Sequence, residues 1–110
     1  MKNLLLIMLC TLCWCGAVAE ENKSMIIDVR TLEEWKAGHL ASAQHIELQN
    51  IAVSIEQLVP DKDQQLYLYC RSGNRSGQAK AIIEQMGYAN VVNAGGIGDA
   101  SIVLDEAIVE

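Results

Sequence analysis

The segment over residues 67–88, YLYCRSGNRSGQAKAIIEQMGY, constrains the fold more than any other part of this sequence. An apolar run suited to a buried strand ends at Cys70, a polar loop follows, and a helical pattern begins directly after the loop. Apolar residues recur at the spacing of one helix face: Ala79, Ile82, Ile83 and Met86. Gly87 is placed to end that helix. A strand, a tight loop and a helix in this order are typical of an α/β domain.

The rest of the chain alternates expected strands and helices in the same way. Further strands are expected at residues 25–29, 45–48 and 90–93, beside the one at 66–69. A capping box of Thr31 and Glu34 opens a helix that ends near Gly38, and a second helix runs from a cap at Asn50 to Pro60. A tight turn is expected at residues 95–96 and a last helix at 99–109. This order predicts a mainly parallel central sheet flanked by helices.

The N-terminal residues predict an export signal that precedes the domain. Lys2 is followed by an apolar stretch over residues 4–14, and Ala17-Val18-Ala19 is a small-x-small cleavage site. The stretch is shorter than the roughly 20 residues that a membrane-spanning helix needs. We therefore expect cleavage after Ala19, a mature domain over residues 20–110, a periplasmic location and no stable membrane insertion after cleavage.

Export changes what the cysteines can do. Three of the four lie in the expected signal segment: Cys10, Cys13 and Cys15. The mature chain then keeps only Cys70, which excludes an internal disulfide and leaves a free thiol in an oxidising compartment. No spacing of metal ligands remains, so no metal site is expected.

The charge of the chain is acidic, at −6, and loss of Lys2 with the signal would make it −7. This argues against a nucleic acid or an anionic membrane as partner. Only three arginines occur, and two of them, Arg71 and Arg75, lie in the loop after Cys70. The loop is therefore expected to concentrate positive charge on an acidic protein.

The loop residues favour a reactive thiol. Gly73 and Asn74 tolerate unusual backbone angles, so consecutive N–H groups can form a concave nest ahead of a helix that begins near Ser76. Such a nest, with arginines beside it, lowers the pKa of a thiol and suits a nucleophile that attacks an anion. The alternative is that Cys70 is merely a small buried apolar residue.

Three motifs resemble signatures of the rhodanese sulfurtransferases. The loop is Cys70-Arg71-Ser72-Gly73-Asn74-Arg75-Ser76-Gly77. The first signature is Ile27-Asp28-Val29-Arg30 with Glu34-Trp35, Gly38-His39, Ala43 and Ile46, and the closing one is Asn93-Ala94-Gly95-Gly96-Ile97. A tryptophan that family members often carry after the closing motif is replaced by Gly98-Asp99-Ala100, which leaves the C-terminal packing open.

The resemblance implies a rhodanese-like domain and a sulfur-transfer mechanism. Cys70 would attack the outer sulfur of thiosulfate, release sulfite and keep a persulfide, which cyanide or a thiol then removes. The persulfide is covalent, so no separate cofactor is expected. The implied cradle consists of Arg71, Ser72, Gly73, Asn74 and Arg75, and Arg71 and Arg75 are candidates to attract the anion. Supporting positions are Ser76, Asp28, Arg30 and His39, of which the last three are better explained as scaffold.

Two other functions compete with this interpretation. Cysteine phosphatases and arsenate reductases use His-Cys-x5-Arg, whereas here Tyr69 precedes the cysteine, Arg75 lies five positions after it and Ser76 takes the sixth. The shorter loop suits one sulfur atom better than a phosphoryl group. A sulfur carrier that presents a persulfide to a partner, with little turnover of its own, is the second alternative.

Overall fold

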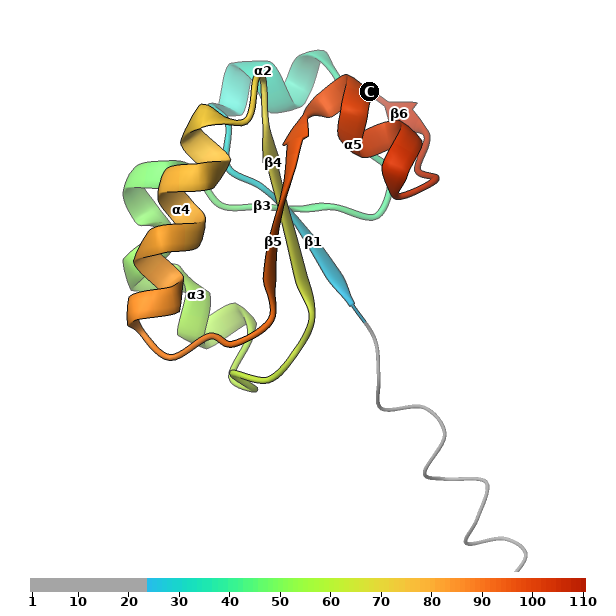
Figure 1. The fold of residues 1–110 in the computed structure, drawn as a ribbon. Coiled ribbons are helices and arrows are strands. Elements are labelled where there is room, and N and C mark those ends of the chain that lie inside the picture. The colour runs from blue at the N-terminus through green and yellow to red at the C-terminus, as the bar shows by residue number, and fades with distance from the viewer. Residues whose placement is uncertain (1–23) are drawn as a thin grey trace, which may run out of the picture.

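A four-stranded parallel sheet forms the centre of the domain in the computed structural model, which describes residues 24–110. The strand order is β3-β1-β4-β5, and every neighbouring pair is parallel. The strands are β1 (Met25–Asp28), β3 (Gln44–His45), β4 (Leu66–Cys70) and β5 (Val91–Gly96). Helices flank this sheet on both faces (Figure 1), so the predicted fold class is confirmed. The expected export signal and its cleavage after Ala19 lie outside the described residues.

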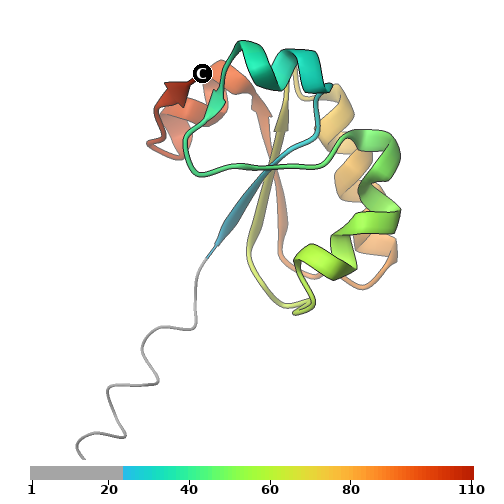
Figure 2. The ribbon, with the colours of Figure 1, turned by 180° about the vertical axis from the view of Figure 1, so that it is seen from behind.

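Two helices cover one face of the sheet and one covers the other. Helices α3 (Ile51–Leu58) and α4 (Asn74–Gln85) pack together on the first face, and α5 (Ile97–Val103) lies on the second (Figures 1 and 2). The short helix α2 (Leu32–Ala37) lies at the end of the sheet where β4 terminates (Figure 1). None of the helices described here is long and apolar enough to cross a membrane.

Strand β4 is buried on both faces, as a central parallel strand must be. Leu66, Leu68 and Cys70 point into a core shared with α3 and α4, whereas Tyr69 points into a smaller core with Leu40 and Ala100. The alternation places Cys70 on the α4 side of the sheet. The thiol therefore faces the first turn of the helix that follows it.

Local end signals in the sequence set the helix boundaries. The capping box of α2 is confirmed: the N–H of Glu34 donates to Thr31 Oγ1 at 3.2 Å, and the N–H of Thr31 donates to Glu34 Oε1 at 3.0 Å. Helix α4 begins at Asn74, earlier than expected, because Gly73 adopts φ +96° and turns the chain directly out of the loop. Gly87, with φ +105°, ends it as predicted.

Two predictions for the middle of the chain need correction. Residues 45–48 are not a strand; β3 is limited to Gln44–His45, and Leu48–Asn50 forms a 3₁₀ turn (η2). The change occurs because the N–H of Leu48 bonds to the carbonyl of Val29 beyond the end of β1, where the chain turns into α3. Asn50 occupies the cap position of α3, but its side chain makes no cap hydrogen bond.

The glycine pair at residues 95–96 does not form the expected tight turn. Both glycines belong to β5 and pair with Tyr69 and Cys70, after a register shift that leaves Ala94 without a partner in the ladder. Gly95 accommodates this irregularity with φ +87°. The closing motif therefore runs beside the cysteine rather than away from it.

The C-terminal helix also ends earlier than expected. Helix α5 ends at Val103, and Ile108–Val109 forms a strand, β6, that pairs antiparallel with β2 (His39–Leu40). Asp105, with φ +54°, reverses the chain between the two. The helix stops because the last residues find backbone partners in β2, which lies far away in the sequence.

Candidate active site

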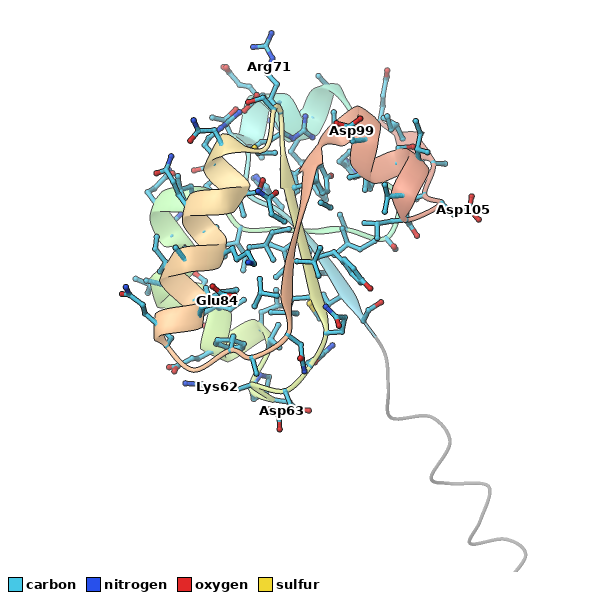
Figure 3. All side chains as sticks on the ribbon, in the orientation of Figure 1. Lys62, Asp63, Arg71, Glu84, Asp99 and Asp105 are labelled. Carbon is cyan, nitrogen blue, oxygen red and sulfur yellow. The ribbon has the colours of Figure 1, made fainter. Side chains whose placement is uncertain are left out.

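Cys70 is the last residue of β4 and lies at the carboxyl edge of the sheet, where parallel α/β sheets place their sites. Its exposed fraction is 0%. The loop Arg71–Gly73 passes over it and leads into α4, with Arg71 projecting outward from the loop (Figure 3). Strand β5 lies on one side of this loop and α2 lies near its end (Figure 1).

The thiol sulfur is surrounded by hydrogen-bond donors. The N–H of Gly73 donates to Sγ at 2.9 Å, and the hydroxyl of Ser76 lies 3.4 Å from it. Burial would raise the pKa of Cys70, but hydrogen bonds from the Ser76 hydroxyl and from the N–H groups of Ser76, Ser72 and Gly73 outweigh it and lower the pKa to about 7. A substantial fraction of Cys70 is therefore a thiolate near neutral pH.

The two loop arginines have different surroundings. Arg75 makes a forked ion pair with Glu34 of α2, with Nη1–Oε1 at 2.8 Å and Nη2–Oε2 at 3.0 Å. The hydrogen bond from Arg75 is the main reason that the pKa of Glu34 falls to about 2. Arg71 is exposed and makes no ion pair within residues 24–110. Of the two, Arg71 is thus the one with a free guanidinium.

Asp28 and Arg30 form a buried pair one strand away from Cys70. Arg30 Nη2 donates to Asp28 Oδ2 at 2.7 Å and to the carbonyl of Gly38 at 2.6 Å, while Arg30 Nε bonds both carboxylate oxygens. The exposed fractions are 0% for Asp28 and 6% for Arg30. The pair joins β1 to the end of α2, which is a scaffold role.

His39 contacts α2 rather than the cysteine loop. Its ring stacks on Trp35 with centroids 3.5 Å apart, and Nδ1 lies 2.9 Å from the Trp35 carbonyl. His45 stacks on the same indole at 5.0 Å. These contacts describe a stacked aromatic group that stiffens α2. No group of His, Cys, Asp and Glu side chains suited to a metal ion occurs between residues 24 and 110.

The backbone of β5 packs directly against the loop. A Cβ atom at Gly96 would lie 2.5 Å from the Arg71 carbonyl oxygen, closer than real Cβ contacts allow, and one at Gly73 would lie 3.4 Å from Gly95 Cα. Glycine at position 96 is therefore required by the close approach of loop and strand.

Gly96→Ala is expected to displace the loop, because the obstructing atom belongs to the backbone and cannot rotate away. The amide donors would move off Cys70 Sγ, and the pKa of Cys70 would rise toward the usual thiol value near 8.5. The measurement is the pH dependence of Cys70 alkylation. Gly98→Ala is the matched control, since nothing lies within 4 Å of a Cβ there. An unchanged pKa in Gly96→Ala would contradict the close approach.

Two residues at the site were not identified from their own sequence context. Glu34 was expected as a cap and as part of the first signature, without a contact to the loop, and in the structure it also binds Arg75. Asn93 was noted within the closing motif, and the structure shows its Oδ1 2.7 Å from the Ser76 hydroxyl and its Nδ2 donating to the Gly73 carbonyl at 3.0 Å. Both residues connect elements that are distant in the sequence, so no local pattern predicts their contacts.

Comparisons with known proteins agree with this geometry. A family model described as rhodanese-like domain matches residues 14–99. The thiosulfate sulfurtransferase PspE of Escherichia coli is 42% identical over 69% of this chain and 73% of its own length, and a sulfurtransferase of Allochromatium vinosum is 33% identical over 72% of each. A solved rhodanese with anions from E. coli superposes with a TM-score of 0.68 at 42% identity, covering 70% of this chain and 91% of that one. The chain therefore belongs to the rhodanese-like family of sulfurtransferases.

Proposed function

We propose that this protein transfers the outer sulfur of thiosulfate through a persulfide on Cys70. The observation that carries the proposal is a thiol of lowered pKa at the base of a ring of N–H donors. The Cys70 thiolate attacks the outer sulfur, the S–S bond of thiosulfate breaks, and sulfite leaves with the bonding electron pair. Cyanide or a thiol then takes the outer sulfur from the persulfide and returns Cys70 to the thiolate.

The shape of the loop favours transfer of a single sulfur atom. The amides of Ser72, Gly73 and Ser76 donate to Cys70 Sγ, and the negative charge of a persulfide on that sulfur would lie within the same group of donors. Arg71 and Arg75 with Ser72, Gly73 and Asn74 make up the proposed cradle. The family relatives that are thiosulfate sulfurtransferases favour the same donor. We propose that cyanide serves as the acceptor in an assay in place of a thiol acceptor. We also propose that no separate cofactor takes part.

The test is the mass of the Cys70 peptide with and without thiosulfate. Trypsin releases residues 63–71, which contain Cys70 and none of the other cysteines. Protein treated with thiosulfate and then alkylated should give this peptide with one added sulfur atom, and cyanide added before alkylation should remove that sulfur with formation of thiocyanate. No added sulfur would refute the proposal, and uptake without turnover to any acceptor would identify a sulfur carrier instead. Hydrolysis of aryl phosphates as fast as sulfur transfer would favour the phosphatase alternative.

We propose a periplasmic location on the basis of the N-terminal sequence. Mass spectrometry of a periplasmic extract should find a chain that begins at Glu20. A full-length chain recovered with the membrane fraction would contradict cleavage after Ala19.

Substitution of Arg71 and of Arg75 by alanine is expected to change the kinetics in different ways. We propose that Arg71 attracts the thiosulfate dianion, because its guanidinium is exposed and unpaired in the described part of the chain, whereas Arg75 holds α2 through Glu34. Arg71→Ala should lower kcat/KM for thiosulfate by roughly tenfold, less for a singly charged thiosulfonate, and less as salt rises. Arg75→Ala should lower kcat/KM for both donors by a similar factor at any salt concentration.

Steady-state kinetics with both donors at low and high salt measures this difference. Arg71→Lys is the control, since lysine keeps the charge but not the fork and should restore part of the attraction. Equal, salt-insensitive losses in both alanine variants would mean that neither arginine recruits the anion.

A further inference from the structure

The side-chain amide of Asn93 has an orientation fixed by the backbone. Its Oδ1 accepts from the N–H of Gly95 at 3.0 Å, and its Nδ2 donates to the carbonyl of Gly73 at 3.0 Å. A flipped amide would place its NH₂ against an N–H and its oxygen against a carbonyl, so both contacts would become repulsive. Oδ1 is therefore the atom that faces the Ser76 hydroxyl.

The hydroxyl of Ser76 has two acceptors and one proton. Ser76 Oγ lies 2.7 Å from Asn93 Oδ1 and 3.4 Å from Cys70 Sγ. Because Oδ1 cannot donate, the shorter contact requires the Ser76 proton to point at Asn93. In that state a lone pair of Oγ faces the sulfur, and the S–H of Cys70 can donate to it.

Ionisation of Cys70 changes this arrangement. A thiolate attracts the Ser76 proton, and when that proton turns to Sγ it leaves two oxygens, Ser76 Oγ and Asn93 Oδ1, in close contact without a proton between them. Ser76 is fully buried, with an exposed fraction of 0%, so water cannot readily supply the missing donor to its oxygen. The hydrogen bond to Asn93 must therefore be given up each time Ser76 stabilises the thiolate.

We propose that Asn93 is a positioning residue that directs the Ser76 hydroxyl away from Cys70 and so restrains the release of the thiol proton. The inference deepens the proposed function, because it concerns the same nucleophile. A thiolate of very low pKa is a weak nucleophile, and the best attacking thiol has a pKa near the ambient pH. Asn93 thus preserves nucleophilicity in a loop whose amides alone would favour a more stable thiolate.

Charged groups around the loop are the same in every variant used to test this. They are Arg71 and Arg75 of the loop and α4, Glu34 of α2, the pair Asp28 and Arg30 beside β1, and Asp99 of α5. Arg75 is paired with Glu34 and Asp28 with Arg30, and no hydrogen bond joins any of these charges to Ser76 or Asn93 in residues 24–110. A change in the Cys70 pKa on substitution of Asn93 therefore reports on the Ser76 hydroxyl.

The experiment is a double-mutant cycle on the full chain. Alkylation by neutral iodoacetamide is followed over pH in the tryptic peptide of residues 63–71, so that Cys70 is measured apart from the other cysteines. Asn93→Leu, which covers Ser76 but offers no acceptor, should lower the Cys70 pKa by about half a unit to one unit. The shift is limited because Asn93 itself is exposed. Ser76→Ala should raise the pKa, and Asn93→Leu should have no further effect in the Ser76→Ala background.

A purely structural role for Asn93 predicts the opposite sign. If the Nδ2 bond to Gly73 only held the loop together, Asn93→Leu would move amide donors off the sulfur and raise the pKa, with or without Ser76. A raised pKa, or an equal shift in both backgrounds, would overturn the proposal. Asn90→Leu is the matched control, since Asn90 Nδ2 bonds the Asp63 carbonyl at the opposite end of the sheet. Asn93→Ala serves the same cycle if Asn93→Leu does not fold.

The measurement uses the resting thiol and no sulfur donor. A shift of the predicted sign in a protein without sulfur transfer would refute the proposed function and leave the role of Asn93 intact. Sulfur transfer with no shift would refute the role of Asn93 alone.

Discussion

Cys70→Ser is expected to abolish both sulfur uptake and transfer, a loss of roughly a thousandfold or more in kcat. A serine hydroxyl stays protonated in a nest that lowers the pKa of a thiol only to about 7, and oxygen cannot hold the transferred sulfur as a persulfide does. Thiosulfate should therefore add no mass to the peptide of residues 63–71. Serine is close in size to cysteine, so the unfolding temperature should change little. Sulfur uptake by the serine variant would disprove the assignment of the nucleophile.

Substitution of either member of the Asp28–Arg30 pair is expected to destabilise the domain by about 3–5 kcal/mol. Asp28→Ala leaves the Arg30 guanidinium buried without its carboxylate, and Arg30→Met leaves the Asp28 carboxylate without its two guanidinium donors. The loss follows from an uncompensated buried charge. Replacing both should cost less than the sum of the single changes, because no lone charge remains.

Urea unfolding followed by circular dichroism measures these losses in free energy. The exposed pair Lys80 and Glu84, which are 3.5 Å apart on one face of α4, is the matched control, and its removal should cost below about 0.5 kcal/mol. Single-variant losses at Asp28 and Arg30 as small as those of the control would show that water reaches the pair.

Features that depend on neighbouring residues could be predicted from the sequence. The order of strands and helices follows from apolar periodicity, the start of α2 from the spacing of Thr31 and Glu34, and the end of α4 from Gly87. The reactive setting of Cys70 was also accessible, because strand, glycine-containing loop and helix follow one another without interruption. All of these signals lie within a few residues of the structure that they predict.

Features made by distant residues could not be predicted in the same way. The Arg75–Glu34 ion pair joins residues 41 positions apart, and the Ser76–Asn93 bond joins residues 17 apart. Strand β6 pairs with β2, and although the β-branched Ile108 and Val109 suit a strand, no residue near them in the sequence indicates that partner. In each case the deciding contact appears only once the sheet has brought the elements together, which is why a helix was expected where β6 lies.

The complete burial of Cys70 makes the sulfur inaccessible to another copy of itself. Two thiols must approach to about 2.05 Å to form a disulfide, and each Cys70 lies beneath its own loop. Two copies of the domain could not be cross-linked through this residue unless both loops opened. In the proposed persulfide, a second sulfur would be bonded about 2 Å from Cys70 Sγ. The loop therefore shields the bare thiol from a second copy of the domain, whereas a persulfide would extend the reactive sulfur by one bond length.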